Sequence, residues 1–242
     1  MNESIYTPMT DTPLAHPAPV SLADQTLAQL AVALPGATAL FRRHKLDFCC
    51  GGQISLRDAA AAKGLDLPTL EAALAALERP DRTAEPLDTA ALIDHILSRY
   101  HAVHREQMPE LIRMARRVEA VHRDHPQVPA GLSALLEQAE HELLDHMTKE
   151  EEILFPMMRR GAGGGMAQYP IRVMRQEHHS HGEMIAALMA RTQDATPPEG
   201  ACTTWRALYA GLASLVDDLM KHIHLENNQL FPAFEPSKTG AA

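Results

Sequence analysis

His146-Met-Thr-Lys-Glu150-Glu-Glu-Ile-Leu154-Phe155-Pro156 and His222-Ile-His-Leu-Glu226-Asn-Asn-Gln-Leu230-Phe231-Pro232 share one frame, His-x3-Glu-x3-Leu-Phe-Pro, and lie 76 residues apart. On a helix, residues four apart lie one above the other on the same face, so each copy directs an imidazole and a carboxylate to a common point. Both groups are common ligands of transition metals. The repeated frame therefore predicts two helices that each contribute two ligands to a metal site.

A shorter echo precedes each copy of the frame. His101-x2-His104 stands 45 residues before His146, and His178-x2-His181 stands 44 residues before His222. The repeating unit is therefore a pair of helices, and two such pairs predict a four-helix bundle with ligands on every helix. The sequence predicts an all-α protein, because it is rich in Ala, Leu, Met and Glu and has only 4% aromatic residues.

Charge, apolar runs and cysteine content predict which partners and which compartment the protein has. The net charge is −9 and no stripe of clustered Lys and Arg occurs, so we expect no nucleic-acid partner. The sequence has no apolar run of about 18 residues and no visible signal peptide, so we expect no membrane span and a cytoplasmic location. Two of the three cysteines are adjacent, which fits a reducing compartment better than a disulfide framework.

Breaks in periodicity divide the chain into four segments. We expect a disordered Pro- and Thr-rich tail over residues 1–20, a small helical domain over 21–79, a linker over 80–88 and the four-helix bundle over 89–235. The small domain holds only short helices and buries little surface by itself, so it is expected to be a satellite of the bundle.

Caps and prolines predict where individual helices begin and bend. Ser21-x-x-Asp24 resembles a capping box and predicts a helix from Ser21 to about Leu34. Ser55 and Pro68 predict the first turns of two later helices. Within the bundle, Pro109 and the two Leu-Phe-Pro tails are expected to kink their helices.

One imidazole from each helix and two carboxylates form the predicted ligand set. Two iron ions suit this set, because each can receive two histidines and share both glutamates, which leaves room for a bridging oxygen and an open position for a diatomic ligand. The predicted ligands are His101, His146, Glu150, His178, His222 and Glu226. A single His-x3-Glu is usually a solvated pair, so the prediction depends on the repetition.

Other polar side chains lie near these positions in the sequence. His122 follows His101 by 21 residues on one predicted helix, about 30 Å along its axis, so both cannot bind one centre unless the helix folds back. His104 and His181 lie one turn from a predicted ligand and are expected either beside the site or on the bundle surface. Glu177 is a candidate to hold an imidazole or to move protons.

Cys49-Cys50-Gly51-Gly52 is a second constellation. Adjacent thiols beside glycine can closely approach a metal or an electrophile, because glycine permits open backbone conformations. The alternative is a pair of buried, unreactive cysteines at the end of a helix. Cys202 precedes a predicted helix, where a capping or packing role is favoured over reactivity.

At these residues the chain resembles the repair of iron centres family, di-iron proteins with a hemerythrin-like bundle behind an ScdA-type N-terminal domain. The motifs that carry the resemblance are Leu40-Phe41-Arg42, Asp47-Phe48-Cys49-Cys50-Gly51-Gly52, Arg99-Tyr100-His101, Glu177-His178 and the two His-x3-Glu frames. The resemblance implies the same six iron ligands and a dimer. It also implies a role in restoring iron–sulfur clusters damaged by nitric oxide or oxidative stress.

Three functions therefore remain open from the sequence. The leading hypothesis is repair of damaged iron–sulfur proteins by a di-iron protein, with Cys49 and Cys50 receiving or relaying iron or nitric oxide. The second is binding, scavenging or reduction of nitric oxide. The third is an oxygen or redox sensor whose bundle signals to the small N-terminal domain.

Overall fold

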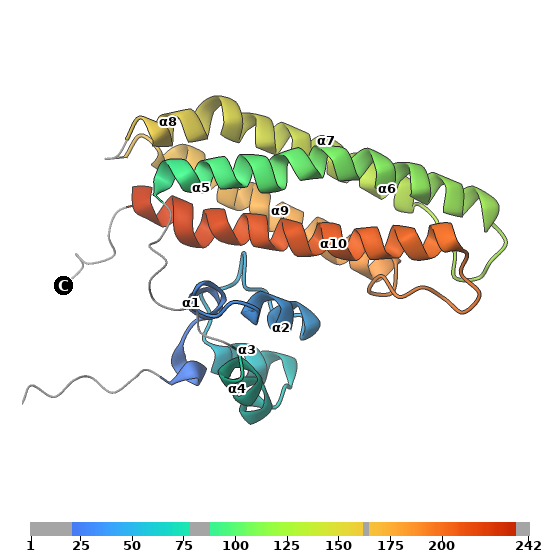
Figure 1. The fold of residues 1–242 in the computed structure, drawn as a ribbon, viewed down its shortest axis with the longest axis horizontal. Coiled ribbons are helices and arrows are strands. Elements are labelled where there is room, and N and C mark those ends of the chain that lie inside the picture. Colours follow the sequence, from blue (N-terminus) through green and yellow to red (C-terminus); the bar gives the residue numbers. More distant parts are fainter. Residues whose placement is uncertain (1–20, 78–87, 162–164, 236–242) are drawn as a thin grey trace, which may run out of the picture.

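The computed structural model describes residues 21–77, 88–161 and 165–235, and every regular element in those ranges is helical. Four long helical rods run side by side (Figure 1). This arrangement confirms the prediction of an all-α fold with a four-helix bundle. The rods are α5 (Thr89–Ile96), η2 (Leu97–His101) and α6 (Ala102–Val121); α7 (Leu132–Lys149), η3 (Glu150–Leu154) and α8 (Phe155–Arg159); α9 (Gln168–Arg191); and α10 (Thr203–Leu225), η4 (Glu226–Leu230) and η5 (Phe231–Phe234).

Three of the rods contain a π-helical turn. These turns are η2, η3 and η4, whereas η5 is a short 3₁₀ turn. The leucine of each Leu-Phe-Pro tail, expected to kink, is the last residue of η3 or η4, and Phe-Pro follows directly. Pro109 lies inside α6, which extends on both sides of it, and the described irregularity of that rod lies earlier, in η2.

The interior of the bundle is layered along its axis. A long apolar core surrounds Trp205, Leu136 and Leu212, and a shorter one at the other end holds Ile96 and Phe231. Between these cores lie buried histidines and glutamates, which is the reverse of the usual exclusion of ionisable groups from a protein interior. The polar layer is therefore held between two apolar plugs.

The N-terminal region, residues 21–77, forms a smaller helical unit beside α10 (Figure 1). Its elements are η1 (Leu22–Asp24), α1 (Leu27–Ala33), α2 (Ala37–Arg43), α3 (Leu56–Lys63) and α4 (Leu67–Ala75). Phe41, Phe48, Leu56 and Leu74 fill its core, and Ile223 of α10 completes it. The unit thus packs on the bundle through apolar contacts.

Helix starts in the N-terminal region test the capping predictions. The prediction that Ser21 opens a helix to Leu34 is wrong: Ser21 caps only the turn η1. Helix α1 begins after Thr26, which forms a reciprocal capping box with Gln29. Ser55, by contrast, caps α3 as predicted, and Pro68 lies in the first turn of α4. Thr26 Oγ1 accepts a hydrogen bond from the backbone N–H of Gln29, and Gln29 Oε1 accepts one from the backbone N–H of Thr26, whereas Ser21 forms no such reciprocal pair with Asp24 in the described structure.

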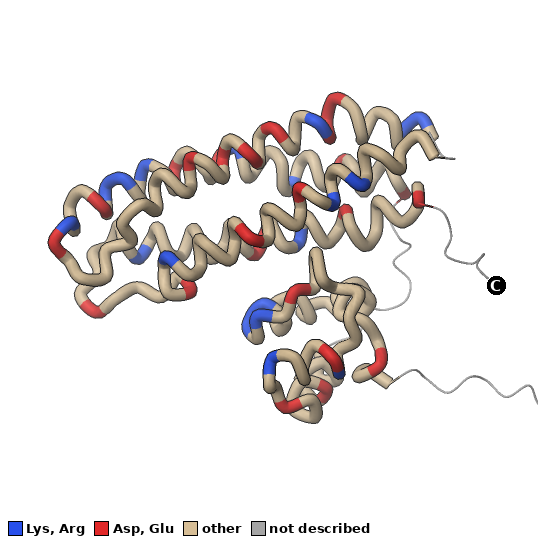
Figure 2. Tube along the Cα trace, turned by 180° about the vertical axis from the view of Figure 1, so that it is seen from behind, with Lys and Arg blue, Asp and Glu red and all other residues tan. Residues whose placement is uncertain are grey.

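The predicted tail over 1–20 and nearly all of the predicted linker over 80–88 lie outside the described residues, so the division into domains stays a prediction. In the part of the chain that the structure describes, no helix combines the length and apolarity needed to cross a membrane. Basic and acidic positions are interspersed along the described bundle helices (Figure 2).

Candidate metal centre

The six predicted ligands converge in the polar layer of the bundle. His101, His146, His178 and His222 are each at most 1% exposed, and both glutamates are fully buried. Their ligand atoms form two groups, each lying within 4.8 Å: His101 and His222 with both glutamates, and His146 and His178 with both glutamates. We call these the His101–His222 position and the His146–His178 position.

Each glutamate spans the two positions. Glu150 directs Oε2 to His101 Nε2 and Oε1 to His146 Nε2, both at 3.4 Å. Glu226 directs Oε1 to His222 Nε2 and Oε2 to His178 Nε2, both at 3.0 Å. One oxygen of each carboxylate therefore faces each histidine pair, which is the arrangement that a bridging carboxylate requires.

Local backbone geometry brings these side chains inward. His101 ends the π-helical turn η2, and Glu150 and Glu226 begin η3 and η4. A π turn inserts one extra residue into an α-helix and occurs often at functional sites. Both turns at the glutamates start directly after the four-residue His-x3-Glu spacing, so the α-helical stacking of each pair is preserved.

The glutamates are poorly satisfied without a cation. Among the described residues, neither oxygen of Glu150 accepts a hydrogen bond, and Glu226 Oε2, 3.0 Å from His178 Nε2, accepts none of good geometry. Burial and the nearby Glu226 charge raise the pKa of Glu150 well above its usual value. Burial also acts to raise the pKa of Glu226, but His222 and His178 hold that pKa below its usual value. Because buried unpaired carboxylates are costly, this donor set fits a divalent metal.

The histidines are prepared to act as neutral ligands. Burial lowers the pKa of His101 to about 4, and it lowers the pKa of His146 to about 4. Both imidazoles are therefore unprotonated at neutral pH, as metal ligation requires. Their Nε2 atoms lie 3.1 Å from His222 Nε2 and 3.2 Å from His178 Nε2, respectively.

Three of the four histidines are held through Nδ1 by a polar side chain. His101 Nδ1 lies 2.7 Å from Glu151 Oε1, and His178 Nδ1 lies 2.9 Å from Asn227 Oδ1. His222 Nδ1 is buried without a partner among the described residues. Such contacts fix the tautomer and the ring orientation of a metal ligand.

Glu177 lies against an imidazole, although not that of its neighbour His178. Its Oε2 accepts a hydrogen bond at 2.8 Å from His146 Nδ1, and its Oε1 accepts one at 2.6 Å from Lys149. The hydrogen bond from His146 is the main cause that lowers the pKa of Glu177 to about 2. Glu177 is therefore a fixed negative charge beside the site, and its role in moving protons stays a prediction.

Two further histidines lie inside the bundle, so the surface alternative for them is wrong. His104 is fully buried, neither of its nitrogens has a hydrogen-bond partner among the described residues, and its ring centre lies 5.5 Å from that of His222. The ring centre of His181 lies 4.8 Å from that of His146. Burial lowers the pKa of His104 to about 2 and that of His181 to about 3.

His122 lies outside the polar layer. Its Nε2 atom is 3.1 Å from Cys202 Sγ, and its ring packs on Trp205 in the long apolar core. Helix α6 does not fold back at Pro109 to bring His122 to the metal centre. Cys202 is the N-cap residue of α10, without a capping hydrogen bond from its side chain.

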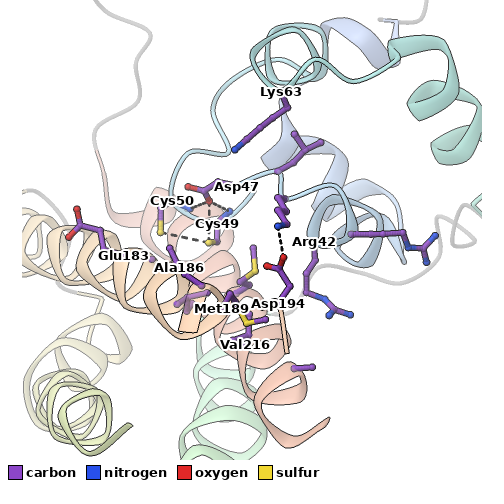
Figure 3. Close-up of a pocket in the computed structure, with 18 of the residues that line it drawn as sticks. Arg42, Asp47, Cys49, Cys50, Lys63, Glu183, Ala186, Met189, Asp194 and Val216 are labelled. Atoms are coloured by element: carbon purple, nitrogen blue, oxygen red, sulfur yellow. Dashed lines mark hydrogen bonds and ion pairs between the residues drawn. The ribbon is translucent and has the colours of Figure 1, made fainter. Parts of the chain in front are cut away.

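The Cys-Cys turn lies directly on the bundle (Figure 3). Cys50 Sγ lies 3.3 Å from the carbonyl oxygen of His178, and Asn227 Nδ2 donates a hydrogen bond at 3.1 Å to the carbonyl oxygen of Cys49. Asn227 thus contacts both the turn and a histidine of the polar layer. Hydrogen bonding with Cys50, followed by burial, raises the pKa of the Cys49 thiol well above its usual value.

Sequence reasoning missed Glu151 and Asn227. Each residue directly follows the glutamate of a repeated frame, and each contacts the histidine of the preceding helix. A comparison of the two frames beyond their identical letters would have paired them. The missed signal is that both have a side chain with an acceptor oxygen.

Comparisons with known proteins agree with this geometry. Residues 92–234 match the Hemerythrin HHE cation binding domain, and residues 23–78 match ScdA_N, Domain of Unknown function (DUF542). A protein from Escherichia coli O157:H7 called "Iron-sulfur cluster repair protein YtfE" is 52% identical over 213 residues, which is 86% of this chain and 96% of the relative. Proteins of the same name from Yersinia pseudotuberculosis (strain IP 31758) and Dickeya chrysanthemi are 52% and 51% identical, again over 86% of this chain and 96% of each relative.

Proposed function

This chain belongs to the family of iron–sulfur cluster repair proteins, with its ScdA-type and hemerythrin domains, and we propose that it restores damaged iron–sulfur clusters using two irons in the bundle. The observation that carries the proposal is the position of Glu150 and Glu226, each with one oxygen toward each histidine pair. Each iron would take two histidines and share both carboxylates, with an oxo or hydroxo bridge between them.

When bound, the two irons supply a redox-active pair with room for a small ligand such as nitric oxide or dioxygen. The chain positions that pair. Glu151 and Glu177 orient His101 and His146 through Nδ1, and Phe155 and Phe231 pack on the imidazoles of His101 and His178 and keep water from that end of the site.

Glu177 is proposed to hold the imidazole of His146, because its carboxylate accepts the hydrogen bond from Nδ1 and remains ionised between His146 and Lys149. Cys49 and Cys50 are proposed to receive or relay iron or nitric oxide, since the turn touches the backbone of His178. The partners would be damaged iron–sulfur proteins in the cytoplasm, met by a homodimer of this chain.

Reactivation of a nitrosylated iron–sulfur enzyme tests the proposal. The purified protein loaded with two irons should restore activity, and Glu150→Leu and Glu226→Leu should not, because each removes a bridging carboxylate. Mössbauer spectroscopy follows the irons in the same samples. Failure of the loaded wild-type protein to reactivate the enzyme would reject repair, and coupled irons in both variants would reject the bridging assignment.

The second candidate is the handling of nitric oxide itself. It is favoured by the number of protein ligands, because six for two irons leave positions open on both. Stopped-flow mixing of the diferrous protein with nitric oxide separates the cases. A stable nitrosyl species indicates binding or scavenging, nitrous oxide release indicates reduction, and neither outcome with efficient cluster reactivation favours repair alone.

A further inference from the structure

The Cys-Cys turn also borders a cavity of about 840 Å³ between the N-terminal region and the bundle (Figure 3). Cys49 is 5% exposed and Cys50 is partly exposed, and both line this cavity. Its walls are largely apolar and carry charged residues of both signs, and they include Arg42, Lys63, Glu183, Ile185, Met189 and Val216. The two thiols therefore lie between a solvent-connected space and the metal centre of the bundle.

The separation of the two sulfur atoms matches a tetrahedral metal site. Cys49 Sγ and Cys50 Sγ are 3.7 Å apart. Two sulfurs at about 2.3 Å from one ion lie about 3.8 Å apart when the angle between them is tetrahedral, and about 4.6 Å apart when the ion is linear and two-coordinate. The observed distance favours a divalent ion over the linear geometry of copper(I).

The same turn is poorly suited to a disulfide. Neighbouring Cα atoms across a trans peptide are about 3.8 Å apart, whereas disulfide-linked residues usually have Cα atoms about 4.4 to 6.8 Å apart. No cis peptide occurs in the described chain. A disulfide would require the backbone to move, whereas chelation would not, because the two sulfurs already have the required separation.

The backbone holds the thiols in this arrangement. The carboxylate of Asp47 accepts hydrogen bonds from the backbone N–H groups of Cys49, Cys50 and Gly51 at 3.1, 2.9 and 2.9 Å. At Gly52, a Cβ atom would lie 2.2 Å from the carbonyl oxygen of Phe48, so only glycine fits. The turn is thus fixed before any ligand arrives, which lowers the entropic cost of binding.

We propose that Cys49 and Cys50 chelate one divalent metal ion, iron(II) or zinc(II), with its remaining positions facing the cavity. Asp47 can reach the same ion, since its oxygen and both sulfurs lie within 4.8 Å. We assign the sulfurs as ligands because the Asp47 oxygens already serve the backbone. Each thiol releases its proton to solvent in the cavity as its metal–sulfur bond forms, and the Asp47 charge favours a cation there. The use of this site to load or pass iron rests on the proposed function.

Cobalt(II) is the probe for this site, because thiolate ligation gives a near-ultraviolet charge-transfer band and tetrahedral ligation gives intense visible bands. The full chain, with iron already in the bundle, should show these bands on adding one equivalent under anaerobic conditions. Cys49→Ser and Cys50→Ser should lose the charge-transfer band, and Cys202→Ser should keep it. Absence of the band in the wild-type protein, its survival in a double Cys49→Ser/Cys50→Ser variant, or its loss in Cys202→Ser would overturn the site.

Two further measurements keep the test decisive. Far-ultraviolet circular dichroism should be unchanged in the serine variants. In the wild-type protein bound cobalt should protect Cys50 from alkylation, and an unprotected Cys50 contradicts chelation. Displacement of cobalt by iron(II) alone, or by zinc(II) alone, then identifies the ion. Cluster repair without a cobalt band rejects the thiolate site and leaves the proposed function standing. A cobalt band without cluster repair supports the thiolate site and rejects the proposed function.

Discussion

At the His101–His222 position, His101 faces the carboxylate of Glu151, and Tyr100 stacks on His222, whose Nδ1 has no described partner. At the His146–His178 position, His146 faces the carboxylate of Glu177 and His178 faces the neutral amide of Asn227. The ligands repeat almost identically, and their neighbours do not.

Among the described residues, hydrogen bonds link the His146–His178 position to the N-terminal region. Asn227 links His178 to the backbone of Cys49, and Cys50 lies on the carbonyl group of His178. A repeated ligand frame can therefore hold two similar ions in surroundings that differ in charge, hydrogen bonding and access. The His146–His178 position is therefore the one whose surroundings should change when the N-terminal region moves.

The largest effect is expected from two separate variants, each of which removes one histidine from one of the two positions. His101→Ala and His178→Ala should each lower the iron content from about two to about one ion per chain, because each removes a ligand from only one position. Iron analysis with Mössbauer spectroscopy measures the loss and identifies the remaining environment. If both variants leave the same residual spectrum, the two positions are not distinct.

Acid stability of the metal-free protein tests the buried histidines beside each position. The pKa of His104 is about 2 and that of His181 about 3, both below the ordinary value of 6.5, so the unfolded state binds more protons as pH falls from 6.5. Each histidine should remove up to about 1.4 kcal/mol of stability per pH unit below pH 6.5.

Urea unfolding from pH 7 to pH 4.5 measures this effect. His104→Leu and His181→Leu should each flatten the pH dependence by about one proton, with stability fully retained above pH 6.5 and lost below it. If the slope of stability against pH stays unchanged in one variant alone, the buried histidines beside the two positions differ in how strongly their protonation is suppressed.

Glu151→Ala and Asn227→Ala form a matched pair, because each removes the partner of one Nδ1 atom. Loss of such a partner typically lowers metal affinity about 10- to 100-fold. Competition with a chelator measures the affinity. Only Asn227→Ala should also speed amide hydrogen exchange at the Cys-Cys turn, and equal exchange in both variants would break the proposed link to the N-terminal region.

The smallest effect is expected from the cations behind the two carboxylates. Arg105 contacts Glu151 and Lys149 contacts Glu177, and both cations are more than a third exposed. Arg105→Ala and Lys149→Ala should each cost about 0.5 kcal/mol or less in thermal unfolding, because exposed ion pairs contribute little. A larger loss in 1 M salt than in low salt would contradict a screened ion pair.

Spacing predicted which side chains meet in the polar layer, because the relevant geometry is local; their role as ligands stays a prediction. Four residues between His146 and Glu150 place both on one helical face, and a helical rise of about 1.5 Å per residue separated His122 from His101. The prediction failed where two local signals competed, since Thr26 and not Ser21 had a partner for a capping box.

The periodicity of the sequence does not predict contacts between segments that are far apart in the chain. The position of Cys50 on the backbone of His178 depends on how the N-terminal region packs on α9 and α10, and no periodicity in either segment encodes it. The cavity beside the turn arises in the same way. For Glu151 and Asn227, the repeated frame gives matching positions in the sequence, but it does not predict the histidines that these side chains contact.

The π-helical turns have a consequence for how such a bundle tolerates insertions and deletions. An α-helix turns about 100° per residue, so the extra residue in η3 or η4 offsets the angular phase of everything that follows it. Leu154 and Phe155, like Leu230 and Phe231, are buried at the end of these turns. Deleting one exposed residue, such as Ile153, would therefore act as a rotation of the whole end of the rod, turning its apolar plug toward solvent.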